Sequence, residues 1–100
     1  MSEWERRVAG VIQHLTELCV DEGDTEAAIE TAQRGVHLIP THGGVTEALM
    51  RAHAADGDLH SVHRVYETHC RALDNLGLDE PAESTVELYD TLRRRSGHHA

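Results

Sequence analysis

The sequence predicts an all-α protein in which helical hairpins form a right-handed stack of five helices. Three observations support this fold class. Five stretches repeat apolar residues every three or four positions, which is the period of an amphipathic helix. A tripeptide of the form acidic–Gly–Asp occurs twice, and its glycines, Gly23 and Gly57, are 34 residues apart. No stretch alternates apolar and polar residues for long enough to indicate a strand.

The first helix is expected from Ser2 to Glu22. Ser2 and Glu5 have the spacing of a capping box, in which each side chain accepts a hydrogen bond from a backbone N–H of the other residue. Gly23 is expected to end the helix, because glycine tolerates a positive φ. The predicted buried stripe consists of Trp4, Val8, Ile12, Leu15 and Cys19.

The second helix is expected from Thr25 to Ile39, with Asp24 as its N-cap and Pro40 as its stop. Its inner face contains several small residues, so another helix can approach it closely. That face consists of Ala28, Ala32, Gly35, Val36 and Ile39. The third helix is expected from Gly44 to Asp56, with Gly57 as the break after it. Its inward residues are Val45, Leu49 and Ala52.

The fourth helix is expected from Leu59 to Asn75 and the fifth from Ala82 to Arg95, with a turn over residues 76–81 between them. The apolar side of the fourth helix consists of Leu59, Val62, Val65, Tyr66, His69 and Leu73. The fifth helix turns Val86, Tyr89 and Leu92 inward, and Ser84 and Glu87 form a second possible capping box. Residues 1–95 therefore form the domain, and residues 96–100 are expected to be a disordered tail.

The 34-residue offset between the two glycines is the period of the tetratricopeptide repeat, a helix–turn–helix unit. The first unit keeps most of the repeat pattern and departs from it only at Ala32, where a bulky residue belongs. The second unit departs at His69 and Asp74, where a small residue and a proline belong. The alternative is two ordinary hairpins with similar loops. Agreement between the period, the loops and the helical pattern favours the repeat.

Four segments follow one another in a characteristic order: residues 18–28, residues 48–52 before Gly57-Asp58, Val65-Tyr66-Glu67 before Leu73, and Leu76-Gly77 with Glu80-Pro81 before Thr85 and Leu88-Tyr89. On these segments, the chain from about Arg6 to Arg95 resembles the bacterial transcriptional activator domain. This tetratricopeptide-like module occurs in antibiotic regulatory proteins and related multidomain bacterial proteins.

Regulators of this family usually carry a winged-helix DNA-binding domain and additional helices before such a segment. The chain therefore resembles the C-terminal part of the module. The resemblance implies a non-catalytic protein–protein interaction or dimerisation role in a bacterial regulatory protein.

Composition excludes several other functions. The nine basic residues are all arginine, and 18 acidic residues bring the formal net charge to −9. Such a charge argues against direct binding of nucleic acid or of an anionic membrane surface by this chain. The apolar runs are too short for a membrane-spanning helix, and the first residues do not form a signal peptide, so we expect a cytoplasmic protein. Neither Cys19 nor Cys70 lies in a catalytic pattern, and we expect no enzyme activity and no cofactor.

Two surfaces are candidate binding sites. In stacked hairpins the first helix of each pair lines the concave face. The candidate partner groove on that face consists of Gln13, Glu17, Asp21, Glu47 and Arg51. The candidate self-association patch lies at the start of the chain and consists of Trp4, Val8 and Val11, whose exposure would favour pairing with another copy.

Two alternative functions remain open. One is a structural scaffold module within a larger membrane- or envelope-associated protein. The other is a pH- or zinc-responsive element, because nine histidines are many for 100 residues. His60, His63 and Glu67 share one face of a helix, which makes a zinc site conceivable. The chain lacks paired cysteines and a His-Glu-x-x-His motif, so we assign no metal ligands.

Overall fold

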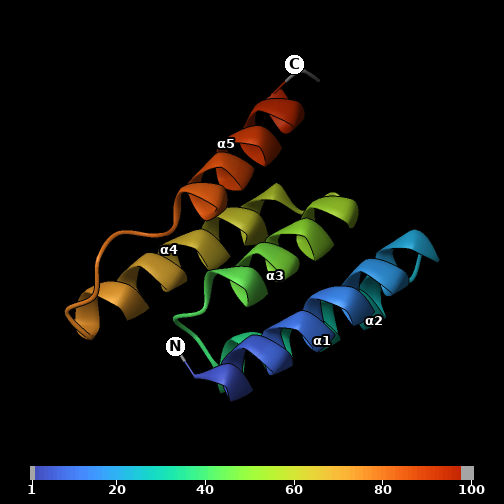
Figure 1. The fold of residues 1–100 in the computed structure, drawn as a ribbon. Helices are drawn as coiled ribbons and strands as arrows, with labels where there is room; N and C mark the ends of the chain where they lie inside the picture. Colours follow the sequence, from blue (N-terminus) through green and yellow to red (C-terminus); the bar gives the residue numbers. More distant parts are fainter. Residues whose placement is uncertain (1, 98–100) are drawn as a thin grey trace.

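A computed structural model describes residues 2–97, which form five helices and confirm the predicted stack of helical hairpins (Figure 1). The helices are α1 (Glu3–Asp21), α2 (Thr25–Leu38), α3 (Gly43–Ala55), α4 (Leu59–Asn75) and α5 (Glu83–Gly97). Each helix packs against the next or the next but one, and α3 contacts all four others. The stack is flat, with extents of 39 × 26 × 17 Å. In Figure 1, α1 and α5 lie at opposite ends of it.

The two repeated loops adopt the same structure. Asp24 and Asp58 are N-caps, and each accepts a hydrogen bond of 3.0 Å, from the N–H of Ala27 and of Ser61 respectively. The glycine before each aspartate has a positive φ, 80° at Gly23 and 76° at Gly57. The two loops also touch each other, because the Thr25 hydroxyl donates to the Asp56 carboxylate over 2.9 Å. The similarity of the two loops in sequence, which predicted a repeat, therefore reflects a repeated structure.

The two predicted capping boxes have different outcomes. The Ser2 Oγ accepts from the N–H of Glu5 at 3.1 Å, so Ser2 caps α1 as expected. Ser84 is not a cap, because α5 already begins at Glu83 and the Ser84 hydroxyl donates to the Glu47 carboxylate instead. The backbone of α5 is helical through Gly97, and residues 98–100 of the expected tail lie outside the described residues.

The predicted inner face of α2 is confirmed, and its small residues explain the close helix packing. Ala28 and Ala32 are fully buried. At Gly35, an added Cβ would lie 2.8 Å from Ile12 Cγ2 of α1 and 3.0 Å from Val45 Cγ1 of α3. Gly35 therefore lies where three helices converge, and a side chain there would push them apart.

The predicted buried stripe of α1 is wrong at two of its five positions. Trp4 is 57% exposed and Leu15 is 44% exposed, while Val8, Ile12 and Cys19 are half-buried. The buried residues of α1 are Ala9 and Thr16. Small side chains at these positions let α1 lie close to its neighbours, and the Thr16 hydroxyl is satisfied by the Ile12 carbonyl at 2.7 Å. The larger apolar residues are thereby turned outward.

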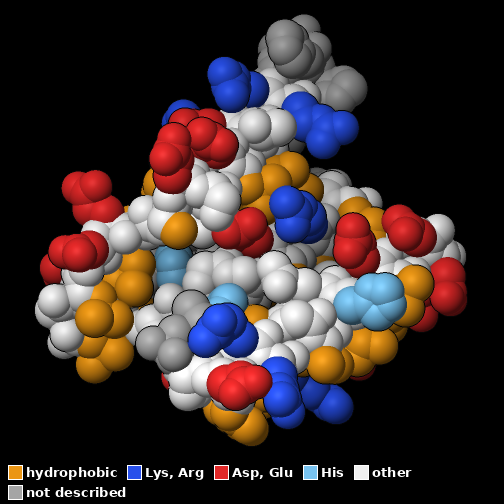
Figure 2. All heavy atoms as spheres, in the orientation of Figure 1, with side chains coloured by type: hydrophobic (Ala, Val, Ile, Leu, Met, Phe, Trp, Pro, Cys, Tyr) orange, Lys and Arg blue, Asp and Glu red, His pale blue; other side chains and the backbone are white. Residues whose placement is uncertain are grey.

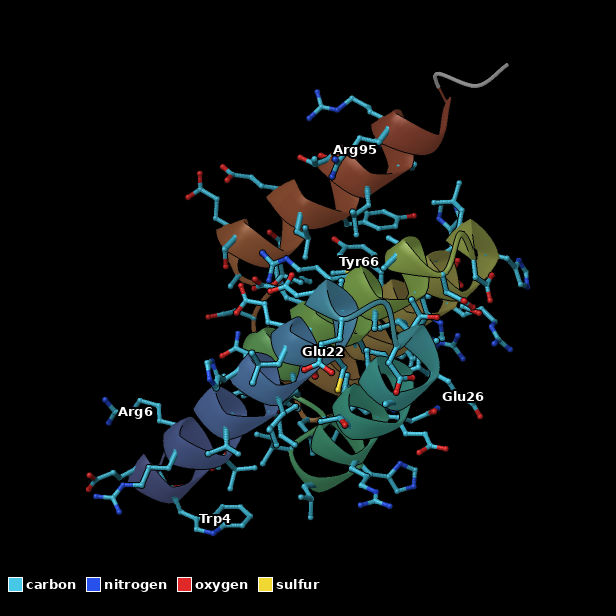
Figure 3. All side chains as sticks on the ribbon, turned by 90° about the vertical axis from the view of Figure 1, so that its right-hand side faces the viewer. Trp4, Arg6, Glu22, Glu26, Tyr66 and Arg95 are labelled. Atoms are coloured by element: carbon cyan, nitrogen blue, oxygen red, sulfur yellow. The ribbon has the colours of Figure 1, made fainter. Side chains whose placement is uncertain are left out.

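Aromatic contacts hold α5 against α4. The rings of Tyr66 and Tyr89 stack with centroids 4.0 Å apart, and Figure 3 shows Tyr66 between the two helices. The guanidinium carbon of Arg93 lies 5.5 Å from the centroid of the Tyr89 ring. Beneath this pair, Met50 and Val62 join Leu92 in a buried cluster that closes the end of the stack.

Candidate functional site

The most distinctive surface is an apolar row on α1, which we call the α1 stripe: Trp4, Val8, Val11, Leu15 and Leu18, all exposed except the half-buried Val8. Trp4 and Val11 are each 57% exposed, and Leu15 and Leu18 are each 44% exposed. Figure 2 shows hydrophobic side chains along the lower edge of the molecule, over α1. In Figure 3, Trp4 points away from the helices. Exposing four large apolar side chains on one helix costs solvation free energy that contact with another protein would recover.

This stripe contains the candidate self-association patch of Trp4, Val8 and Val11 and extends beyond it. Val8 also packs on the buried cluster of Ala9, Ile39 and Val45, so it links the stripe to the core. Sequence reasoning missed Leu15 and Leu18 as surface residues, because α1 is apolar on two sides and Leu15 fits either. The small residues Ala9 and Thr16 were the available signal for the true inner face.

Charged residues border the α1 stripe. Arg7 forms an ion pair of 3.0 Å with Glu3, and both side chains are more than 70% exposed. His14 and Asp21 follow Arg7 at steps of seven residues and are also exposed. These three residues form a row beside the stripe that runs from a cation at one end of α1 to an anion at the other.

The candidate partner groove is only partly assembled. Gln13, Glu17 and Arg51 line one hollow of about 460 Å³ together with Thr16, Val20 and Ala48. Asp21 is exposed at the end of α1 and does not line this hollow. Glu47 is engaged elsewhere, because its Oε2 accepts from the hydroxyls of Ser84 at 3.0 Å and Thr85 at 2.9 Å. The hollow therefore lies between α1 and α3, while Glu47 joins α3 to α5.

A second hollow, of about 310 Å³, lies between α2, α3 and α4, and three histidines line it: His37, His53 and His69. Burial lowers the pKa of His69 from its ordinary value of 6.5, and this is partly opposed by a hydrogen bond with the Pro40 carbonyl, 3.2 Å from Nδ1. Burial also lowers the pKa of His53, whose buried Nδ1 has no hydrogen-bond partner in the described structure. Sequence reasoning did not bring these two residues together, since they lie on different helices.

One of the two histidines considered for zinc has another role in the fold. The Nδ1 atom of His63 shares a hydrogen bond with the hydroxyl of Tyr89, so this ring joins α4 to α5. Among residues 2–97, no group of three or more histidine, cysteine or acidic side chains is arranged to hold a metal ion. Cys19 and Cys70 are free thiols and half-buried.

Five helices in consecutive hairpins, two equivalent loops and a packed central α3 define a tetratricopeptide-like helical-repeat domain. The sequence matches the family model of the bacterial transcriptional activator domain over residues 1–93. The chain therefore belongs to the bacterial transcriptional activator domain family, which is a family of regulatory domains rather than of enzymes.

Comparisons with curated proteins and with solved structures give no significant match. Within the part of the chain that the structure describes, no helix combines the length and apolar character needed to cross a bilayer.

Proposed function

We propose that this chain is a protein–protein interaction module of a cytoplasmic bacterial transcriptional regulator and that it associates through the α1 stripe. The observation that carries the proposal is the exposure of Trp4, Val11, Leu15 and Leu18 along one helix. Buried apolar surface is the main favourable term in protein association, and aromatic residues contribute most to it.

The net charge supports contact with protein rather than with DNA. At a net charge of −9, the chain repels phosphate, because 18 acidic residues outnumber its nine arginines. In this proposal DNA contact, where the regulator makes it, belongs to other parts of the regulator. The domain contributes association, which brings two regulators or a regulator and its partner together.

The hollow between α1 and α3 is a second candidate contact surface. Glu17 and Arg51 place opposite charges beside the amide of Gln13, which suits a short polar peptide. The hollow is small and its lining is more polar than the α1 stripe, so it offers less apolar surface to bury. We therefore assign the principal contact to the α1 stripe.

Size exclusion with light scattering, over a concentration series at neutral pH, tests the proposal. We expect the wild-type mass to rise above the 11.1 kDa of one chain and Val11→Asp to return it to that value. Val11 is exposed, so the substitution leaves the core intact, and circular dichroism checks that the helices persist.

Leu76→Asp is the matched control. Leu76 is also a large exposed hydrophobic, at 67% exposure, but it lies after α4 rather than on α1. This variant should associate as the wild type does. A wild-type chain that stays at the mass of one copy at every concentration would contradict association through the stripe. Equal loss of association in both variants would show that the contact is not specific to α1.

A further inference from the structure

We infer that the α1 stripe binds a second copy of the same chain, with the two α1 helices antiparallel about a twofold axis. This inference rests on the proposed function and specifies the partner and its orientation. Three features of α1 support it: the spacing of the stripe, the order of the charges beside it and the sizes of the facing side chains.

The stripe has the spacing of a helix-pairing seam. Its residues follow one another at steps of four, three, four and three, from Trp4 to Leu18. Apolar residues at alternating steps of this kind keep facing a partner helix along its length. The seam covers about 21 Å of helix, at 1.5 Å per residue. The buried residues Ala9 and Thr16 lie on a different face of α1, and within the seam Val8 is half-buried against the core while the other four residues are exposed.

The charges beside the seam are self-complementary in one orientation only. Arg7 and Asp21 are equally far from His14 along α1. In an antiparallel pair centred beside His14, Arg7 of each copy lies near Asp21 of the other. The dimer then contains two ion pairs, each between an arginine and an aspartate. A parallel pair would place Arg7 beside Arg7 and Asp21 beside Asp21, which is repulsive. The row of charges therefore selects the antiparallel pair.

Side-chain sizes fit the same register. With Arg7 beside Asp21 of the second copy, Val11 faces Leu15 and Val8 faces Leu18. Each layer then pairs one smaller and one larger aliphatic side chain, and the twofold axis repeats the same layers on its other side. Trp4 lies at the end of the seam and covers the last turn of the second α1. A second copy thus matches the stripe in spacing, in charge and in volume.

Charge reversal tests the register. In Arg7→Asp the dimer contains two pairs of like charge, and in Asp21→Arg it does so as well. We expect each single variant to raise the dimer dissociation constant about tenfold, because two partly exposed ion pairs are lost. The double variant exchanges the two charges and should return the dissociation constant to near the wild-type value. Analytical ultracentrifugation over a dilution series measures all four proteins.

Glu26→Arg is the control for net charge. It changes the total charge by as much as Asp21→Arg does, but Glu26 lies on α2 and its side chain is exposed outside the seam. We expect little change in the dissociation constant of this variant. A change as large as that of Asp21→Arg would mean that total charge, and not the Arg7–Asp21 contact, governs association, which would overturn the register.

Cross-linking measures the orientation directly. In a background with Cys19 and Cys70 replaced by serine, one preparation carries Arg7→Cys and another carries Asp21→Cys. A short bismaleimide should link the two preparations when they are mixed and should link neither strongly alone. Linking within the Arg7→Cys preparation would indicate a parallel pair and overturn the inference.

The outcomes separate the inference from the proposed function. A dimer that Val11→Asp dissociates, but whose double charge variant stays weak, overturns the antiparallel register and leaves association through the α1 stripe standing. A chain that is monomeric at all concentrations overturns both. Rescue by the double variant, together with cross-linking only in the mixture, supports the twofold antiparallel pair.

Discussion

Gly35 shows how a single residue sets the distance between helices. Its missing side chain lets Ile12 and Val45 meet over the surface of α2, at distances that leave no space for a methyl group. The small residue that the repeat pattern requires at this position is therefore a packing requirement. The sequence could predict this close approach, because Ala28, Ala32 and Gly35 follow one another on the same face of α2.

We predict that Gly35→Ala destabilises the domain by about 1–3 kcal/mol, the usual cost of overfilling a packed core. The control is Gly10→Ala, because Gly10 is exposed on α1 and an added Cβ there meets nothing within 4 Å. In that variant the free energy of unfolding should rise by about 0.5–1 kcal/mol, which is the difference in helix propensity between glycine and alanine. Urea denaturation measures both. Similar effects of the two substitutions would contradict the close contact at Gly35.

His53 and His69, two of the histidines that line the second hollow, make the folding stability depend on pH. Because burial lowers the pKa of His53 and His69 below 6.5, the unfolded chain takes up protons more readily than the folded one. Folding stability should therefore be fully present above pH 6.5 and should decrease as the pH falls below that value. Urea midpoints at pH 7.5 and at pH 5.5 measure the difference.

His69→Gln should reduce that difference, whatever it does to the stability at pH 7.5. His69 is 3% exposed, and its Nδ1 lies 3.2 Å from the Thr46 hydroxyl, so the variant also tests this contact between α3 and α4. His60→Gln removes one exposed imidazole from the same helix and is the matched control. A pH difference that His69→Gln leaves unchanged would show that other groups are responsible for it.

At the scale of the helices, α5 depends on a polar link that sequence reasoning could not identify. The Glu47 carboxylate accepts from two α5 hydroxyls, and one of these belongs to the fully buried Thr85. Sequence reasoning placed Glu47 on the open concave face, because it read each hairpin separately. The two partners lie 37 and 38 residues further along the chain, which a helical period cannot reveal.

We predict that Glu47→Ala weakens the attachment of α5 more than it affects the first hairpin. Hydrogen bonds to a charged acceptor contribute roughly 1.5–3 kcal/mol, and the buried Thr85 hydroxyl would lose its partner. Hydrogen exchange should become faster in α5 while α1 and α2 change little. Glu47→Gln keeps an acceptor oxygen, so its rate of hydrogen exchange in α5 should lie between those of the wild type and of Glu47→Ala. Equal acceleration in all helices would argue against a local link.

The bounds of the helices could be predicted closely from the sequence, but the face that α1 turns inward could not, and this failure has a physical cause. All five helices begin and end within two residues of the predicted positions, since N-caps and glycines act locally. The rotation of α1 about its own axis could not be predicted from the sequence, because apolar side chains occupy more than half of its circumference. In that situation the periodicity gives several equally good faces, and the sizes of the facing residues on α2 and α3 decide between them.

For the whole molecule, the two ends of the stack differ. One end presents the apolar α1 stripe, and the other presents α5 with the exposed residues Arg93, Arg94 and Arg95. An apolar stripe and a row of exposed arginines are not complementary surfaces, so we expect little head-to-tail association into open chains of molecules. A twofold contact, in contrast, buries the same surface on both copies and leaves none free for a third.

We therefore predict that association stops at two copies. In the concentration series, the mass should reach a plateau at twice the 11.1 kDa of one chain. A mass that keeps rising with concentration would show an open contact and would contradict the closed pair. A patch around Trp4 could be predicted from the sequence, but a closed seam could not, because the positions of Leu15 and Leu18 depend on the packing of α1.

Trp4 is the only tryptophan in the chain, and it lies on the surface in the folded monomer. Its fluorescence should therefore change little when the monomer unfolds, because the indole is largely in water both before and after. The same emission should move to shorter wavelength when a second molecule covers the ring. The two tyrosines stack between α4 and α5, so their absorbance reports unfolding instead. The protein thus contains separate optical probes for assembly and for folding, and neither process needs an attached label to be followed.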